Sequence, residues 1–335
     1  MYLGLGDEVL NFVPFFKGMM CLKPFLDYNA QLKKLSDDKG LIITDEEKAK
    51  VKLNEIGYFT LIGGYKDLLR DSNTRKYFDG VTFDDVLEIY NFDTSIRELF
   101  FHYICKIEKH MRSVISYEFC YEHGENQAEY LDCNTYRYKG NSTKNQKQIK
   151  KLTKMLKEVV KSKKYPYINH QRNAYKNIPL WVLINALEFG KISTMYEMFK
   201  ISLQIKVSNN FVFVTNGELI KFMKVLVSFR NVCAHHERFF SYKSQYDIPD
   251  TLIHKKLNIQ RNNGRYMYGK KDVFAVLIAC MYLLSREDFL KLKRELFKEI
   301  EDFLSKDKAI KRKDLYAHMG FPNNVKDITR YRKLK

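Results

Sequence analysis

The stretch Thr94–Tyr121 reads TSIRELFFHYICKIEKHMRSVISYEFCY and decides the fold class. Its apolar residues recur at steps of three and four, and they are Ile96, Leu99, Phe100, Tyr103, Ile104, Ile107, Met111, Val114 and Ile115. This period matches the 3.6 residues of a helical turn and places the side chains on one stripe. The stretch therefore predicts a long central helix that packs by one face.

The same spacing runs through most of the chain, which has only 6 prolines and 15 glycines among its 335 residues. Residues typical of helix starts precede several of these patterns, at Thr44-Asp45-Glu46-Glu47, Asn216-Gly217-Glu218, Asp272 and Ser285. Gly57 is placed to end the first of these helices. Two short runs, 41–43 and 211–214, are the strand candidates, and the second also fits a buried connection. We therefore predict an all-α helical bundle.

The composition narrows the class of protein further. Hydrophobic residues make up 45% of the chain and aromatic residues 14%, which excludes a disordered chain. The longest purely apolar run, 273–284, has twelve residues, whereas a membrane-spanning helix needs about 20. Asp7 and Glu8 stand where a secretion signal is basic, so we expect a cytoplasmic protein without membrane contact. Met19 or Met20 is an alternative start.

The formal net charge of +18 is concentrated in two segments. Residues 137–176 carry 13 Lys or Arg against a single Glu158, and residues 306–335 carry ten basic and three acidic residues. Tyrosines, Tyr165 and Tyr167 among them, lie between the lysines of the first segment. Single-stranded nucleic acid needs such cations for its phosphates and flat rings for its bases. The pattern indicates RNA binding, although a solubilising helix face and a disordered tail also fit it.

The candidate RNA-binding residues lie in these two segments and in a smaller basic run, 255–271. They are Lys144, Lys147, Lys150, Lys151, Lys154, Lys157, Lys161, Lys163, Lys164, Arg172, Arg261, Arg265, Lys311, Arg312 and Lys313.

The same patterns suggest a division of the chain. The predicted parts are an N-terminal extension, an N-terminal helical subdomain, a main helical domain and a basic tail, at 1–22, 23–80, 81–305 and 306–335. The main domain contains a basic insertion, 132–178. In it, loops at about 131–145 and 164–178 flank a helix at 146–163.

The candidate catalytic residues lie in Phe229-Arg230-Asn231-Val232-Cys233-Ala234-His235-His236-Glu237-Arg238-Phe239-Phe240, at the C-terminal end of an apolar helix that begins near Glu218. Asn231 and His235 are four residues apart and share a helix face, whereas Arg230 lies about 140° from His235. One helix end therefore offers an imidazole, an amide and a guanidinium.

These groups suit RNA cleavage without a metal ion. A neutral imidazole can take the proton of a 2′-OH near neutral pH, and the 2′-oxygen then attacks the adjacent phosphorus. Arg230 would stabilise the charge on the phosphoryl oxygens, and Asn231 would hold the phosphate or the histidine. A second group must protonate the leaving 5′-oxygen, and a second copy of the helix in a dimer could supply it.

Other interpretations of this helix end are simpler. The helix dipole by itself favours Arg and His near a C-terminus. His235 and His236 point about 100° apart and have no acidic partner at helical ligand spacing, so we expect no metal site. The six cysteines form no C-x-x-C pair and are expected to be free thiols. A Gly-rich phosphate loop is also missing from the sequence, so no cofactor is predicted.

Arg230-Asn231-x-x-x-His235 resembles the Arg-x-x-x-x-His motif of HEPN-domain ribonucleases. Other landmarks resemble, in order, those of the bacterial abortive-infection Abi family, the AbiD- and AbiF-like proteins. These landmarks are Lys23-Pro24-Phe25-Leu26, Ile56-Gly57-Tyr58 with Gly64-Tyr65, Phe92-Asp93 with Arg97, Ile107-Glu108 with Arg112, and Pro179-Leu180-Trp181-Val182 with Phe189-Gly190. The resemblance covers about residues 22–242.

The resemblance implies a HEPN-type bundle and an anti-phage, toxin-like ribonuclease whose composite active site forms in a homodimer. Arg230 and His235 take the catalytic positions and Asn231 the polar position beside the arginine. His236 and Arg238 follow the motif and are candidates for RNA contacts. The group is related to RNA-guided nucleases of type VI CRISPR systems, and some members accompany a small noncoding RNA. RNA is therefore the expected partner as well as the substrate.

Two further features each allow a structural and a functional interpretation. Glu108 and Arg112, one helical turn apart, form either an ordinary ion pair worth a few tenths of a kcal/mol or a pair that orients Arg230 or His235. Trp181, the single tryptophan, lies in an apolar run and is expected in the core rather than on an RNA-stacking surface.

Two other functions are consistent with the sequence. The first is a non-catalytic RNA-binding protein in a lasting complex with a small noncoding RNA. The second is a DNA-binding regulator whose helices within 27–69 read a duplex. No sequence pattern specifies the RNA target, the trigger of activity or a neutralising partner.

Overall fold

The computed structural model describes residues 24–137, 143–306 and 309–333. The predicted extension 1–22, the alternative starts Met19 and Met20, and the basic residue Lys139 lie outside the described residues. In the described part, regular structure is helical apart from two strands of two residues each, which confirms the all-α prediction. None of the described helices has both the length and the apolar character needed to cross a membrane.

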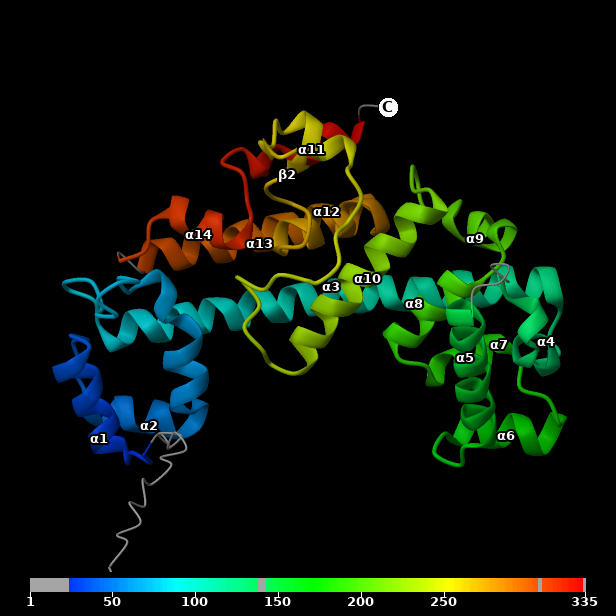
Figure 1. The fold of residues 1–335 in the computed structure, drawn as a ribbon, viewed down its shortest axis with the longest axis horizontal. Coiled ribbons are helices and arrows are strands. Elements are labelled where there is room, and N and C mark those ends of the chain that lie inside the picture. Colours follow the sequence, from blue (N-terminus) through cyan, green and yellow to red (C-terminus); the bar gives the residue numbers. More distant parts are fainter. Residues whose placement is uncertain (1–23, 138–142, 307–308, 334–335) are drawn as a thin grey trace, which may run out of the picture.

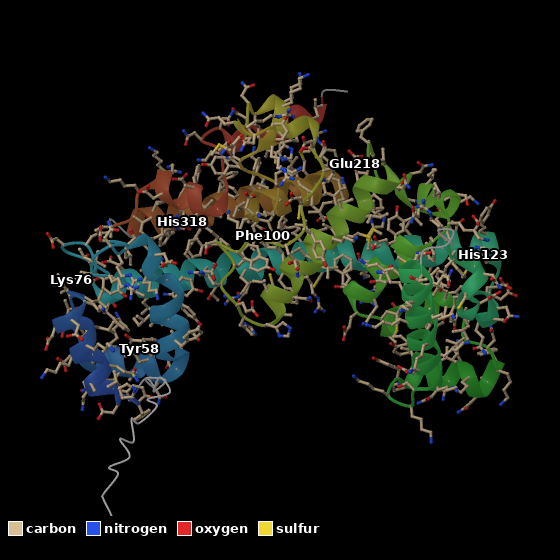
Figure 2. The ribbon with its side chains drawn as sticks, viewed as in Figure 1. Tyr58, Lys76, Phe100, His123, Glu218 and His318 are labelled. Carbon is tan, nitrogen blue, oxygen red and sulfur yellow. The ribbon has the colours of Figure 1, made fainter. Side chains whose placement is uncertain are left out.

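The long helix α3 (Phe83–His123) extends along nearly the whole molecule (Figure 1). A capping box at Thr82 begins it, in which the Thr82 hydroxyl and the Asp85 carboxylate each accept the other residue's backbone N–H. Of the predicted stripe, all residues except Leu99 are buried. Phe100 lies near the middle of the molecule (Figure 2), where full burial of such a side chain stabilises the fold by about 1.5–3 kcal/mol.

The N-terminal subdomain lies beside one end of α3. Its elements are α1 (Tyr28–Lys33), a π-helical turn (Lys34–Asp38), α2 (Glu46–Ile56), a second π-helical turn (Phe59–Gly63) and a 3₁₀ turn (Lys66–Leu68). Asp45 caps α2 by accepting the Lys48 N–H, and Gly57 ends it at φ +87°, as predicted. The strand candidate 41–43 forms only a single bridge, from Ile42 to Thr82.

The basic insertion lies near the other end of α3. Its described elements are a 3₁₀ turn (Cys133–Thr135), α5 (Thr143–Lys161) and α6 (Pro166–Tyr175). It is preceded by α4 (Gln127–Leu131) and followed by α7 (Leu180–Leu183) and a second 3₁₀ turn (Ile184–Ala186). The helix α5 is amphipathic, because Ile149, Leu152 and Leu156 are buried while its lysines face solvent. This agrees with the predicted basic helix at 146–163.

The predicted loop 164–178 is wrong, because α6 occupies most of it. Proline suits a first helical position, where its missing N–H costs nothing, and Pro166 begins α6. The Arg172 guanidinium then ties α6 to the end of α5 by donating to the backbone carbonyls of Val160, at 2.5 and 3.0 Å, and Ser162, at 2.7 Å. Only Ile168 is buried within α6, so the sequence has no periodic apolar pattern from which this helix could be predicted.

Three helices follow the insertion and pack against α3. They are α8 (Phe189–Met198), α9 (Ile201–Ser208) and α10 (Asn216–Ala234). The predicted helix near Glu218 is α10, and its cap is Thr215, whose hydroxyl accepts the Glu218 N–H at 3.3 Å. The run 211–214 is a turn rather than a strand, with Phe211 and Val214 buried.

The C-terminal part covers α3 and α10. Its elements are α11 (Leu252–Lys256), β1 (Arg261–Asn262), β2 (Arg265–Tyr266), α12 (Val273–Leu283), α13 (Arg286–Lys306), α14 (Arg312–Met319) and a 3₁₀ segment (Val325–Lys333). The strands pair antiparallel, with Arg261 opposite Tyr266. The predicted caps are confirmed, because Asp272 accepts the Ala275 N–H and Ser285 accepts the Asp288 N–H.

The prediction that Trp181 lies in the core is wrong. Trp181 is 49% exposed, because α7 turns its neighbours Leu180 and Leu183 inward and leaves the tryptophan on the outer side. The Trp181 ring is thus an aromatic group on the surface beside the basic insertion.

The cysteine prediction is confirmed for the described cysteines. Cys105, Cys120, Cys133, Cys233 and Cys280 are all free thiols.

The arrangement of these parts places the end of α10 centrally. In Figure 1 the N-terminal helices and the insertion project to the same side from opposite ends of α3. The C-terminal end of α10 lies between them, on that same side. The candidate catalytic segment therefore stands between the two parts that flank it.

Candidate active site

The last turn of α10 carries the candidate catalytic residues and ends in a strained turn. The His235 N–H still donates to the Asn231 carbonyl at 2.9 Å, so His235 continues the helical hydrogen bonding. His236 then adopts φ +54°, and the N–H groups of His236 and Glu237 donate back to Cys233 and Val232. This is a Schellman turn, in which glycine is the usual left-handed residue. A histidine there costs roughly 1–2 kcal/mol of backbone strain, a cost found most often at functional sites.

The polar side chains of this helix end face solvent. Asn231, His235 and His236 are exposed, and Arg230 is partly buried. Among the described residues, no hydrogen bond joins the side chains of Arg230 and His235. The two side chains therefore lie at one helix end without using one another as hydrogen-bond partners.

Arg230 lies against the acidic residue Glu108 of α3. Its Nε is 3.6 Å from a Glu108 carboxylate oxygen, and its guanidinium lies 6.0 Å from the centre of the Phe101 ring. That Nε is buried and makes no hydrogen bond. Glu108 is buried and also pairs with Arg112, which in turn donates to the Ile184 carbonyl. The structure thus places the predicted Glu108–Arg112 pair directly beside Arg230.

A second charged pair on α3 holds the segment that follows His236. The buried Asp93 carboxylate accepts the backbone N–H groups of Phe239, at 3.0 Å, and Phe240, at 2.6 Å. Arg97 donates to the Glu237 carbonyl and pairs with Asp93 at 3.3 Å. Burial raises the pKa of Asp93, and the hydrogen bonds that it accepts lower it. These contacts fix the direction in which the chain leaves the helix end.

Sequence reasoning used Asp93 and Arg97 only as landmarks and missed this role. The signal was present, because both residues lie four apart on the apolar stripe that also contains Phe100 and Ile104. Charged groups on a buried helix face are rare unless they are paired or hydrogen-bonded. Asp93, Arg97 and Glu108 are the charged interruptions of that stripe, and all three contact or adjoin the segment 230–240.

The N-terminal subdomain also contacts this segment. Arg238 donates to the Gly64 carbonyl and lies 3.3 Å from an Asp67 oxygen. The Tyr65 ring stacks on Phe240 at 6.1 Å, and the Tyr65 hydroxyl donates to Asp93. Arg238, predicted as a possible RNA contact, is therefore engaged within the protein.

The thiol nearest the site is not poised as a nucleophile. Cys233 lies in the last turn of α10, and burial raises its pKa to about 12. A thiol acts as a nucleophile only as its thiolate. Within residues 24–137, 143–306 and 309–333, no group of three or more His, Cys, Asp or Glu side chains is arranged to hold a metal ion.

The predicted RNA-binding residues fall into two groups. Nine predicted lysines of the insertion are exposed, and in the described part of the chain none of the nine lies within 4.0 Å of a carboxylate: Lys144, Lys147, Lys150, Lys151, Lys154, Lys157, Lys161, Lys163 and Lys164. Arg265, Lys311 and Lys313 are likewise exposed. Arg172, Arg261 and Arg312 instead have partners within the protein.

One of the comparisons with known proteins matches more than half of this chain. A family model described as "Abi-like protein" matches residues 51–241. Neither the search of curated proteins nor the search of solved structures gives a match. The matched region runs from α2 to the segment just after α10. It therefore includes both charged pairs of α3, the insertion and the end of α10.

Proposed function

This chain belongs to the Abi-like protein family, and from that membership we propose that its role in abortive infection is the metal-independent cleavage of RNA by a HEPN-type site. The observation that carries the proposal is the ion pair between Arg230 and Glu108, next to the exposed His235 at the same helix end. A guanidinium held from behind by a buried carboxylate, with an accessible imidazole nearby, suits phosphate chemistry.

In the proposed reaction His235 acts as the general base. It takes the proton of the 2′-OH, the 2′-oxygen forms a bond to the adjacent phosphorus, and the bond from phosphorus to the 5′-oxygen breaks. The products are a 2′,3′-cyclic phosphate and a 5′-hydroxyl. Arg230 stabilises the negative charge on the phosphoryl oxygens, and Asn231 positions the phosphate.

The leaving 5′-oxygen needs a proton from a second acid. We propose that a second copy of this chain brings its own His235 opposite the first, so that the active form is a homodimer. The solvent exposure of Asn231, His235 and His236 supports this arrangement, because groups on the surface can meet across a two-fold axis. The Glu108–Arg112 pair acts as a positioning device for Arg230.

The experiment compares RNA cleavage in EDTA by the wild type, Arg230→Ala and His235→Ala. Removal of a general base or of a charge-stabilising donor typically costs 10²–10⁴-fold. We expect both variants to lose at least about 100-fold in rate. His102→Ala and Arg294→Ala remove the same chemical groups from exposed positions outside the insertion and the end of α10, and should retain full rate. Cleavage at equal rates by all five proteins, or none by the wild type, would refute the proposal.

The second candidate is an RNA-binding protein without catalysis. The exposed lysines of the insertion, which have no carboxylate partner in the described residues, favour it, because such cations bind phosphates without first breaking an ion pair. A high ratio of absorbance at 260 nm to that at 280 nm, retained through moderate salt, together with no cleavage, would favour this candidate. For both candidate functions we propose that the partner is RNA and that the protein acts in the cytoplasm.

A further inference from the structure

A polar stripe on α10 leads to the candidate catalytic residues. Lys221, Lys224, Ser228, Asn231 and His235 are spaced by three or four residues, so they lie within about 80° of the helix surface. The stripe is about 21 Å long at 1.5 Å per residue. Lys221, Asn231 and His235 are exposed, and the other two are partly exposed. Solvent can therefore reach this stripe from one end to the other.

A basic hollow adjoins the far end of the stripe. It has a volume of about 720 Å³ and lies between Lys221, the strand β2 and the residues that precede α12. Its lining has five basic residues, Lys221, Lys243, Arg265, Lys270 and Lys271, and three acidic ones, Asp247, Asp250 and Asp272. Asp250 pairs with Lys270, and Asp272 lies 3.9 Å from the Lys243 ammonium. Lys221, Arg265 and Lys271 are exposed. In the described part of the chain none of these three has a carboxylate within 4.0 Å. The hollow therefore offers three cations that are free to bind an anion.

A second hollow, of about 540 Å³, lies next along the stripe. Lys224 of α10, Lys144 and Gln148 of α5, and Tyr246 line it. The Lys224 ammonium is 6.0 Å from the centre of the Tyr246 ring and 2.8 Å from Glu197. Tyr246 is 44% exposed, so one part of its ring is open to solvent.

The two hollows adjoin one another. Lys221 and Lys224 are one helical turn apart on the same stripe, and they line the first and the second hollow respectively. Of the consecutive residues Tyr246 and Asp247, Asp247 lines the first hollow and Tyr246 lines the second. A basic surface thus continues from β2 along α10 and meets the insertion at Lys144.

We propose that this surface is the track on which single-stranded RNA approaches His235, an inference that rests on the proposed function. Phosphates bind Lys221, Arg265 and Lys271 in the first hollow, and a base stacks on Tyr246. Stacking on an aromatic side chain is worth about 1–3 kcal/mol per base and tolerates any sequence. At about 3.4 Å per stacked nucleotide, the 21 Å stripe accommodates roughly six nucleotides on one side of the cleaved bond.

The experiment measures RNA binding in the His235→Ala background, so that the probe stays intact. The track variant carries Lys221→Ala, Arg265→Ala and Lys271→Ala. The matched control carries Lys291→Ala, Arg294→Ala and Lys298→Ala, which removes three exposed cations from α13 that line neither hollow. The probes are unstructured RNAs of 12 and 4 nucleotides with a 5′ fluorophore, and the readout is fluorescence anisotropy as a function of salt.

The track variant should bind the 12-nucleotide RNA at least tenfold more weakly. Its slope of log Kd against log salt should fall by about 2, because each single-strand phosphate contact contributes about 0.7. The control should stay within twofold. The preference of the His235→Ala parent for the 12-nucleotide RNA over the 4-nucleotide RNA should shrink in the track variant alone. Equal losses in the two variants, or no loss in the track variant, would overturn the track.

Tyr246 gives an independent readout, because stacking involves no counterion. Tyr246→Ala should weaken binding about tenfold with an unchanged salt slope, whereas Tyr246→Phe should bind as the parent does. A loss in both variants, or in neither, would remove Tyr246 from the track. Failure of the proposed function is distinguishable: the wild type would then cleave no RNA although the track variant still loses binding.

Discussion

Two histidines of this protein, His235 and His254, occupy opposite environments. His235 ends α10, and its ring is exposed, with no hydrogen-bond partner among the described residues. His254 in α11 is fully buried, with its ring stacked on Tyr266 at 4.7 Å. Its Nδ1 accepts the Thr251 N–H, so its Nε2–H must donate to the Gly269 carbonyl. The neutral ring of His254 is thus completely satisfied, whereas the ring of His235 is open to contact with a ligand.

The difference teaches how burial assigns one residue type to two roles. Burial lowers the pKa of His254 to about 4, which keeps the ring neutral and structural. The same cluster holds Asp272, which accepts the Gly269 and Ala275 N–H groups and whose pKa burial raises to about 6. Gly269 stands between the two at φ +75°, and an added Cβ would lie 2.8 Å from Phe274. The end of α10 has no such closed network around His235.

The largest effect is expected when one titrating group of the buried cluster, Asp272 or His254, is replaced, and it concerns how the free energy of unfolding depends on pH. Between about pH 4 and 6 folded Asp272 holds a proton that the unfolded chain releases, so its contribution to stability falls as pH rises. Between about pH 4 and 6.5 the unfolded chain protonates His254 and the folded state does not, so its contribution falls as pH falls. The two contributions oppose one another. Asp272→Asn removes the first contribution and leaves the second. As the pH is lowered from 6.5 to 4, we therefore expect the free energy of unfolding of Asp272→Asn to fall by about 3 kcal/mol more than that of the wild type, at 1.36 kcal/mol per pKa unit.

The mirror variant is His254→Gln, which leaves the Asp272 contribution alone. Relative to the wild type, its free energy of unfolding should fall by about 3 kcal/mol between pH 4 and 6. Urea unfolding at half-unit steps of pH measures both variants. If the two variants follow the wild-type pH profile with only a constant offset, the opposed titrations do not exist.

A smaller effect is expected at the end of α10, where Glu108 faces Arg230 beside the exposed His235. Glu108→Gln removes the charge that faces Arg230 while the side chain keeps its shape. We expect the rate of RNA cleavage at saturating substrate to fall about tenfold, or roughly 1.4 kcal/mol, with little change in RNA affinity. Glu98→Gln, an exposed glutamate of α3 outside the ion pairs of the described residues, is the control. The positioning role fails if Glu108→Gln changes affinity and leaves that rate intact.

Local signals in the sequence predicted the parts of the fold that local physics determines. The stripe of α3, the caps at Asp45, Asp272 and Ser285, and the amphipathic basic helix α5 follow from residue spacing and side-chain hydrogen bonds alone. The capping box at Thr215, one residue before the predicted start of α10, shows how closely such a signal locates a helix end.

The missed features depend on tertiary contacts that spacing does not encode. Trp181 is exposed because of how the short helix α7 packs, and α6 is held by the bonds from Arg172 rather than by an apolar face. For the site, the motif predicted Arg230 and His235 on one helix end. The hydrogen bonds from Phe239 and Phe240 to Asp93 join residues 146 and 147 positions apart, so spacing along α10 could not reveal them. The left-handed turn at His236 falls where glycine is usual, so the residue type provided no signal for it.

The central claim is that a 2′-OH attacks the phosphorus while the exposed His235 accepts its proton. The most direct measurement compares an RNA oligonucleotide that the wild type cleaves with the same oligonucleotide carrying a 2′-deoxyribose on the 5′ side of the mapped bond. We predict that this one substitution abolishes cleavage at that bond, and that the unmodified RNA yields a 2′,3′-cyclic phosphate. Undiminished cleavage of the deoxy-substituted bond, or products ending in a free 3′-hydroxyl, would contradict the claim.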